Sequence, residues 1–284
     1  LCDGGGMRHF ILKDGTKKEF SGMEMMGIVN VTPDSFYAGS RVGGTEEALM
    51  KVGKFVSEGA SFIDVGGEST RPGAEKVSPE EEVKRVCPVI AEVKKRYPEI
   101  LVSVDTYNST TASAAVEAGA DIINDISGLT FDENMADVVA DAEVPVVIMH
   151  TQGRPDVMQK NPHYDDVVKE VYEYLEAQRD YAVRKGVNPE KIIIDLGIGF
   201  GKNYEHNIEL LRNIDVFAKL NCPHLLAVSR KSFIGTLLDE KDPEDRLFGT
   251  VAVTLFARIH NIEMARVHDV KENLHAVRML EELI

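Results

Sequence analysis

The sequence predicts an α/β protein, a single (β/α)8 TIM barrel preceded by a short N-terminal β-hairpin. Short apolar runs rich in β-branched residues alternate with amphipathic helical stretches about eight times, and no change of composition interrupts the alternation. The runs are apolar at successive rather than alternate positions, which is typical of strands buried on both faces of a parallel sheet. Strands that alternate with helices over this length favour a barrel, and an open doubly wound sheet is the alternative.

The predicted barrel strands are eight apolar runs. They span residues 25–31, 62–65, 100–104, 122–126, 144–149, 192–196, 225–228 and 265–270. The hairpin is expected ahead of them, with strands at about 9–12 and 17–20 and a turn at Asp14-Gly15. An Asp-Gly pair between two strands favours a tight hairpin turn.

Helices are expected between these strands, and three of them have recognisable ends. Residues 45–59 carry an apolar stripe, and Thr45 is the predicted capped start. Residues 164–185 carry another, and Gly186 is the predicted stop because glycine readily takes the left-handed conformation that ends helices. Ser78-Pro79 predicts the start of a further helix, since proline is favoured in the first helical turn.

Composition and charge exclude several classes of partner. The 284 residues are 43% hydrophobic and 28% charged, an ordinary globular balance. A formal net charge of −15 at pH 7 repels nucleic acid and anionic membrane surfaces. We therefore expect neither nucleic acid nor a membrane as a partner. A few clustered cations in a pocket would still bind an anionic small-molecule substrate.

The cysteines and the absence of targeting patterns favour a reducing compartment. Cys2, Cys87 and Cys222 have neither metal-ligand spacing nor the density of a disulfide framework. No apolar run reaches the ~20 residues of a transmembrane helix, and no signal-peptide pattern is present. A cytoplasmic protein is expected. Residues 7–284 are expected to form one domain, and residues 1–6 to be an added remnant or a disordered start.

Polar side chains recur at or near the C-terminal ends of the predicted strands. They are Asn30, Asp64, Asp105, Asn124, Asp195, Arg230, Lys231, Arg266 and His268. Taken singly, such a residue often only caps a loop or a helix N-terminus. Barrels of this class build their active sites at that rim from strand ends and the following loops. The convergence of the whole set on one rim therefore predicts an active site there.

Arg266 and His268 are two residues apart on a predicted strand, so their side chains project to the same face. An arginine inside a barrel among valine and methionine is costly unless an anion meets it. Two interpretations stay open, a structural ion pair with a rim carboxylate and a phosphate site. His150, at the end of the fifth predicted strand, is expected to be a packed or loop-capping histidine, because no histidine or cysteine spacing supports zinc.

Two glycine-rich loops follow predicted strands, at residues 66–73 and 197–202. Glycine lets a backbone approach a ligand closely, although tight turns alone also explain such runs. In the first loop Arg71 lies between Thr70 and Pro72, where its guanidinium offers a fork of donors to an anion.

The motifs together resemble those of dihydropteroate synthase, a pterin-binding barrel family. The longest are Asn30-Val31-Thr32-Pro33-Asp34-Ser35-Phe36 and Ser229-Arg230-Lys231-Ser232, and others lie at residues 64–73, 103–106, 123–125, 195–201, 249–250 and 266–270. They run in order from about residue 25 to the C-terminus. The resemblance implies that 4-aminobenzoate displaces pyrophosphate from 6-hydroxymethyl-7,8-dihydropterin diphosphate, which yields 7,8-dihydropteroate for folate biosynthesis.

The resemblance also implies roles for individual residues. The pterin-binding residues would be Asp105, Asn124, Asp195 and Lys231, with Asp195 accepting two hydrogen bonds from the pterin edge. The diphosphate-binding residues would be Asn30, Arg266 and His268, with Asn30 also a ligand of Mg²⁺. The aminobenzoate pocket, where sulfonamides bind in the family, would be Thr70, Arg71, Pro72, Phe200 and Ser232. The catalytic residues would be Asp105, Lys231, Arg266 and His268.

The mechanism inferred from this resemblance is dissociative. Pyrophosphate leaves first, because positive charge on the methylene spreads into the pterin ring, and the neutral amine then attacks. One departure from the family pattern is Ala38, where many members carry Asp in the first loop, and an altered affinity for aminobenzoate is expected. A homodimer is expected from the family. The alternatives are a methyltetrahydrofolate-binding methyltransferase domain and a non-catalytic pterin- or phosphate-binding protein.

Overall fold

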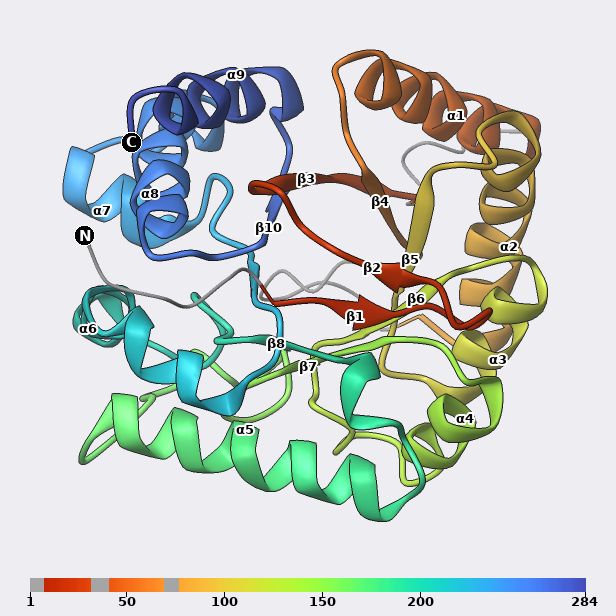
Figure 1. The fold of residues 1–284 in the computed structure, drawn as a ribbon, viewed down its shortest axis with the longest axis horizontal. Coiled ribbons are helices and arrows are strands. Elements are labelled where there is room, and N and C mark those ends of the chain that lie inside the picture. The colour runs from red at the N-terminus through yellow and green to blue at the C-terminus, as the bar shows by residue number, and fades with distance from the viewer. Residues whose placement is uncertain (1–7, 32–40, 69–76) are drawn as a thin grey trace.

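Eight parallel strands close into a barrel that helices surround (Figure 1). The computed structural model describes residues 8–31, 41–68 and 77–284, with residues 41–43 described by their backbone alone. The barrel strands are β3 (Glu24–Asn30), β4 (Phe62–Gly66), β5 (Leu101–Asp105), β6 (Ile122–Asp125), β7 (Val146–Met149), β8 (Ile192–Asp195), β9 (Leu225–Leu226) and β10 (Met264–Val267). Their order is β8-β7-β6-β5-β4-β3-β10-β9.

The two ends of that order meet, which distinguishes the barrel from an open sheet. A parallel bridge joins Ile194 of β8 to His224, the residue before β9, and the Ile194 N–H donates to the Pro223 carbonyl over 2.9 Å. The predicted (β/α)8 fold is thereby confirmed, and the open doubly wound sheet is excluded. The β9 strand is shorter than the predicted run at 225–228.

Helices follow the strands and form the outer ring in Figure 1. They are α1 (Arg41–Ser57), α2 (Pro79–Arg96), α3 (Ser109–Glu117), α4 (Met135–Ala142), α5 (Val167–Arg184), α6 (Tyr204–Arg212), α7 (Ser232–Leu238), α8 (Leu247–Ile259) and α9 (Val270–Glu281). Short 3₁₀ turns lie at η2 (Pro189–Lys191), η3 (Ile214–Leu220) and η4 (Pro243–Arg246). Within the described ranges, no helix combines the length and the apolar character that crossing a membrane requires.

Two of the three predicted helix ends are confirmed. The Ser78 side chain accepts a hydrogen bond from the Glu81 N–H and caps α2, and Gly186 follows α5 with a φ of +102°. The predicted capped start at Thr45 is wrong, because α1 begins at Arg41 and Thr45 lies inside it. An N-cap contributes only about 1 kcal/mol, so a single capping residue does not by itself decide where a helix begins.

The strands bury both faces, but the two faces differ. Outward side chains such as Val29, Val65 and Val104 pack in one apolar core under the helices. Inward side chains near the N-terminal ends of the strands form a second apolar cluster: Met26, Phe62, Ile122, Val147, Ile193, Leu225 and Met264. The predicted hairpin is present as β1 (Phe10–Ile11) and β2 (Lys17–Lys18). It adds Phe10 and Phe20 to that cluster and so closes this end of the barrel.

Candidate active site

At the C-terminal half of the barrel the inward positions become polar. Asp64 on β4 lies two residues beyond the apolar inward Phe62, and Asp105 on β5 is paired in register with Asn124 on β6. Asp195 ends β8, and Arg266 lies on β10. Alternate residues of a strand share a face, so the barrel brings side chains from five different strands into one mouth.

Arg266 is the centre of this polar layer. Its Nε donates to Asp64 Oδ2 over 2.6 Å, and its Nη2 donates to Asp105 Oδ2 over 2.9 Å. The Asn124 amide nitrogen lies 3.4 Å from the same Asp64 oxygen. The ion-pair interpretation of Arg266 is thus confirmed, with two carboxylates in place of the apolar neighbours that the sequence suggested. Asp64 lies in the middle of its strand and not at the end, which is why it reaches Arg266 from inside the barrel.

Burial shifts the pKa values of the charged groups in the mouth. Desolvation raises the pKa of Asp105 to about 7, the Arg266 guanidinium opposes the rise, and Asp64 reinforces it. Desolvation also raises the pKa of Asp195, against the effect of Lys231. The pKa of Lys231 falls to about 8 because burial disfavours its charge more than Asp195 favours it. Titratable groups whose pKa values are shifted this close to neutral pH are characteristic of functional sites.

The loops after β8 and β9 meet at Lys231. The Lys231 ammonium donates to the Ile198 carbonyl and lies 4.7 Å from the centroid of the Phe200 ring. Asp195 Oδ1 accepts the Gly197 N–H over 2.7 Å, which fixes the start of the same loop. The structure therefore places the predicted residues Asp195, Phe200 and Lys231 together. Ser232 follows them as the exposed first residue of α7.

Two further predicted residues lie at the same rim. Asn30 is exposed at the end of β3, and a Cβ placed on Gly66 would lie within 3.6 Å of Asn30 Oδ1 and of the Asp105 carboxyl. The ring of His268 lies beside Ser229, with Nδ1 2.8 Å from its Oγ. Burial first, and then the cations Arg230, Arg266 and Lys51, together lower the pKa of His268 to about 3, so the imidazole is neutral.

Thr70, Arg71 and Pro72 of the aminobenzoate pocket, and Ala38 of the first loop, lie outside the described residues. In the described ranges, no group of three or more His, Cys, Asp or Glu side chains is arranged to hold a metal ion.

Sequence reasoning missed one supporting residue, Lys202. Its buried ammonium donates to His150 Nδ1 over 2.8 Å and to the carbonyls of Gly197 and Phe200, each over 2.9 Å. Desolvation lowers the pKa of Lys202 well below its ordinary value. The expectation that His150 is a packed, loop-capping histidine is confirmed. The sequence signal that could have indicated this role is a lysine directly after a glycine-rich loop, because the carbonyls of such a loop need hydrogen-bond donors.

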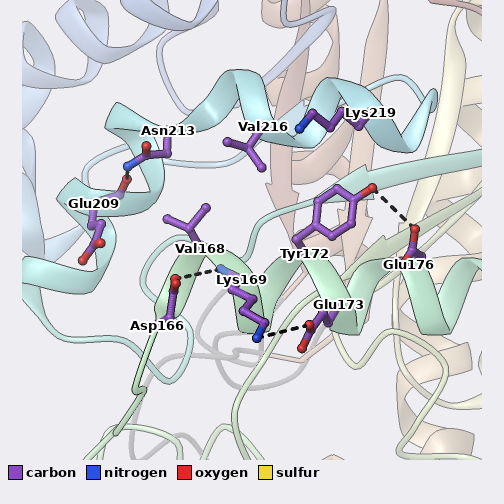
Figure 2. Close-up of a pocket in the computed structure, with 10 residues that line it drawn as sticks. All are labelled: Asp166, Val168, Lys169, Tyr172, Glu173, Glu176, Glu209, Asn213, Val216 and Lys219. Atoms are coloured by element: carbon purple, nitrogen blue, oxygen red, sulfur yellow. Dashed lines mark hydrogen bonds and ion pairs between the residues drawn. The ribbon is translucent and has the colours of Figure 1, made fainter.

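A groove lies elsewhere, on the outer surface between α5, α6 and η3 (Figure 2). Its volume is about 600 Å³. The lining residues are Asp166, Val168, Lys169, Tyr172, Glu173, Glu176, Glu209, Asn213, Val216 and Lys219. None of them belongs to the barrel mouth, and the two lysines lie among four carboxylates. The candidate active site therefore lies at the rim of the barrel and not in this groove.

Residues 26–268 match the sequence profile described as "Pterin binding enzyme". The chain therefore belongs to the pterin-binding enzyme family. It is 42% identical to the dihydropteroate synthase of Escherichia coli strain K12 over 95% of both chains. It is also 42% identical to that of Synechocystis sp. over 91% of this chain and 89% of the relative. Within the family, the chain belongs to the dihydropteroate synthases, which act in folate synthesis.

Solved structures agree with this placement. A Xanthomonas albilineans dihydropteroate synthase with 4-aminobenzoic acid is 39% identical, with a TM-score of 0.90 over 98% of each chain. The same organism's enzyme in complex with 7,8-dihydropteroate gives a TM-score of 0.86 at 36% identity over 97% of this chain and 98% of that chain. A Yersinia pestis enzyme with a sulfonamide drug gives 0.89 at 37% identity, with the same coverage.

Proposed function

We propose that this chain condenses 6-hydroxymethyl-7,8-dihydropterin diphosphate with 4-aminobenzoate to give 7,8-dihydropteroate and pyrophosphate, with the barrel mouth as the active site. The observation that carries the proposal is the shared mouth of Arg266, Asp105, Asp195 and Lys231, which joins polar groups for a heterocycle to an arginine for its diphosphate. The dihydropteroate and 4-aminobenzoic acid complexes of the Xanthomonas albilineans relatives support the substrate assignment.

The pterin would lie among Asp105, Asn124, Asp195 and Lys231. The edge of a pterin presents adjacent N–H donors, which a carboxylate accepts as two parallel hydrogen bonds. Asp195 is the acceptor in this proposal, because the main-chain N–H of Gly197 orients it and no side chain in the described ranges donates to its carboxyl. Hydrogen bonds to a charged group contribute roughly 1.5–3 kcal/mol each, enough to set the orientation of the ring.

Arg266, His268 and Asn30 would bind the diphosphate. Arg266 already gives Nε and Nη2 to Asp64 and Asp105, and its Nη1 has no hydrogen-bond partner in the described ranges. The pairing keeps the guanidinium fixed, so binding costs little side-chain entropy. Asn30 fits a Mg²⁺ site, since this ion commonly takes one or two protein oxygens and completes its shell with water and phosphate oxygens. When bound, Mg²⁺ would neutralise charge on the departing pyrophosphate.

The reaction would begin with cleavage of the C–O bond between the methylene and the diphosphate, and pyrophosphate would take the electron pair. Arg266 and the Nε2 side of His268 stabilise that anion. Asp105 and Asp195 stabilise the positive charge that spreads from the methylene into the ring. The aminobenzoate nitrogen then forms the new C–N bond and loses a proton. No protein nucleophile is needed, in keeping with the absence of a triad in the sequence motifs.

Aminobenzoate would bind beside Phe200 and Ser232, at the loop that Lys231 and Lys202 hold. Thr70, Arg71 and Pro72 would complete the pocket. The sulfonamide complex of the Yersinia pestis relative supports a sulfonamide-sensitive pocket.

A homodimer is part of the proposal, as is a cytoplasmic location. Phe248, Phe256 and Ile259 on α8 are 84%, 37% and 55% exposed, an unusual apolar surface for a free helix. Phe248→Glu is expected to convert a dimer into a monomer in analytical ultracentrifugation. A wild-type protein that sediments as a monomer at all concentrations overturns this point.

The test of the activity is pyrophosphate release measured with and without 4-aminobenzoate and Mg²⁺. Release that requires aminobenzoate supports the synthase. A methyltetrahydrofolate-binding methyltransferase domain would release no pyrophosphate, and a silent binding protein would bind the pterin diphosphate without turnover. The Arg266 and His268 pair distinguishes the synthase structurally, because a methyl donor carries no diphosphate to bind.

A further inference from the structure

Ser229 and His268 make two contacts with each other across neighbouring strand ends. Ser229 follows β9 and is 7% exposed. Its Oγ accepts the main-chain N–H of His268 over 3.1 Å and lies 2.8 Å from Nδ1 of the same imidazole. The hydroxyl therefore contacts both the backbone and the ring of a single residue.

The hydrogens of these contacts can be assigned by counting. A serine hydroxyl has one hydrogen and two lone pairs, and the His268 N–H occupies one lone pair. Across the described ranges, Nδ1 is the only hydrogen-bond acceptor in reach of the Ser229 hydroxyl. The hydroxyl then donates to Nδ1. A neutral imidazole that accepts at Nδ1 carries its proton on Nε2.

The neighbouring residues hold this geometry in place. Arg230 adopts a left-handed conformation with a φ of +59°, and its N–H donates to Thr250 Oγ1 over 3.0 Å. Its guanidinium donates hydrogen bonds to both carboxylate oxygens of Asp269, over 2.7 and 2.9 Å. Residues 229–230 are thus bound pairwise to residues 268–269. A rigid frame of this kind keeps Ser229 within reach of one ring nitrogen only.

We propose that Ser229 is a positioning residue that holds His268 in the Nε2–H tautomer, so that the ring donates a hydrogen bond to the leaving diphosphate. The proposal deepens the proposed function and rests on it. The imidazole lies among cations and is neutral, so it attracts an anion only through an N–H. The other tautomer turns a lone pair toward the phosphate oxygens and repels them. Ser229 therefore decides whether His268 helps the reaction.

The direct test is the tautomer itself, observed in resting protein. Protein labelled with ¹⁵N at its eight histidines is compared with the His268→Gln variant, which identifies the His268 signals in two-bond ¹⁵N–¹H spectra. We expect Nε2 to be protonated and Nδ1 to be unprotonated in the wild type, and a mixture in Ser229→Ala. A wild-type His268 with its proton on Nδ1 overturns the proposal.

A double-mutant cycle tests the consequence. Loss of one hydrogen bond to a charged group predicts that Ser229→Ala lowers kcat/KM for the pterin diphosphate roughly 10- to 100-fold, whereas Ser229→Thr, which keeps the hydroxyl, retains most of it. In His268→Gln, the amide donates from the Nε2 position whatever residue 229 is. Ser229→Ala should then change kcat/KM less than about 3-fold in this background. An equal loss in both backgrounds indicates a merely structural role and contradicts the inference.

The two hypotheses fail in different ways. If the wild type forms dihydropteroate but His268 is protonated on Nδ1, the inference about the tautomer is wrong and the proposed synthase activity is retained. If pyrophosphate release does not depend on aminobenzoate, the proposed function falls, and with it the role given to the Nε2 proton.

Discussion

The guanidinium of Arg266 and the carboxyl of Asp105 lie 2.9 Å apart, 161 residues apart in sequence. The same guanidinium also holds Asp64, so one cation compensates two carboxylates. The pairing places two carboxylates and their shared guanidinium where a cationic ring would form. It also leaves one edge of the guanidinium for an anion, and so serves both halves of the proposed reaction.

Arg266→Met is expected to destabilise the fold by about 3–5 kcal/mol, because it leaves buried carboxylates without their cation. Activity should be lost as well. The double variant Arg266→Met/Asp64→Asn removes one orphaned charge and should regain part of the stability without regaining turnover. Urea unfolding and pyrophosphate release measure the two effects. Recovery of activity in the double variant would show that Arg266 serves only to neutralise Asp64.

The pH profile of kcat/KM is expected to be bell-shaped. The rising limb should follow deprotonation of Asp105, whose pKa is raised to about 7, since the ring needs a carboxylate. The falling limb should follow deprotonation of Lys231, whose pKa is lowered to about 8. Asp105→Asn should remove the rising limb together with most of the rate. A profile flat from pH 6 to 9, roughly one unit beyond each pKa, contradicts these assignments.

Stability should decrease in mild acid because of buried neutral histidines such as His224. Burial lowers its pKa to about 3, so below its unfolded pKa of about 6.5 only the unfolded chain takes up a proton. Stability is therefore complete above that pKa and lost as the pH falls toward 3. At pH 5 the loss is about 2 kcal/mol for this residue.

The matched variant is His224→Leu, which keeps an apolar fit but cannot be protonated. Urea unfolding at pH 7 and pH 5 should show a smaller difference for the variant than for the wild type. An unchanged difference would assign the acid sensitivity to other groups.

Lys202→Met is expected to destabilise the protein by about 2–4 kcal/mol, because the carbonyls of Gly197 and Phe200 and Nδ1 of His150 lose their donor. The loop carrying Phe200 should also loosen, which raises KM for aminobenzoate more than KM for the pterin diphosphate. Lys219→Met, at an exposed position of η3, is the control and should change neither the stability nor the two Michaelis constants. Equal changes in both Michaelis constants would mean that the whole mouth, and not this loop, depends on Lys202.

Local sequence patterns determined the fold and the rim. Consecutive apolar residues in short runs, separated by amphipathic stretches, are set by the burial of each segment alone, so the eight strands could be located before any contact between them was known. The polar residues that end these runs then had to meet, because parallel strands bring their C-terminal ends to one side.

Only the tertiary structure decided which of those polar residues bind each other. Arg266 pairs with Asp64 over 202 positions, Ser229 with His268 over 39, and Lys202 with His150 over 52. No local pattern encodes such pairs, because they follow from barrel closure and from the register between strands. Burial, which sets the pKa values of these groups, is likewise a property of the closed barrel and not of any single strand.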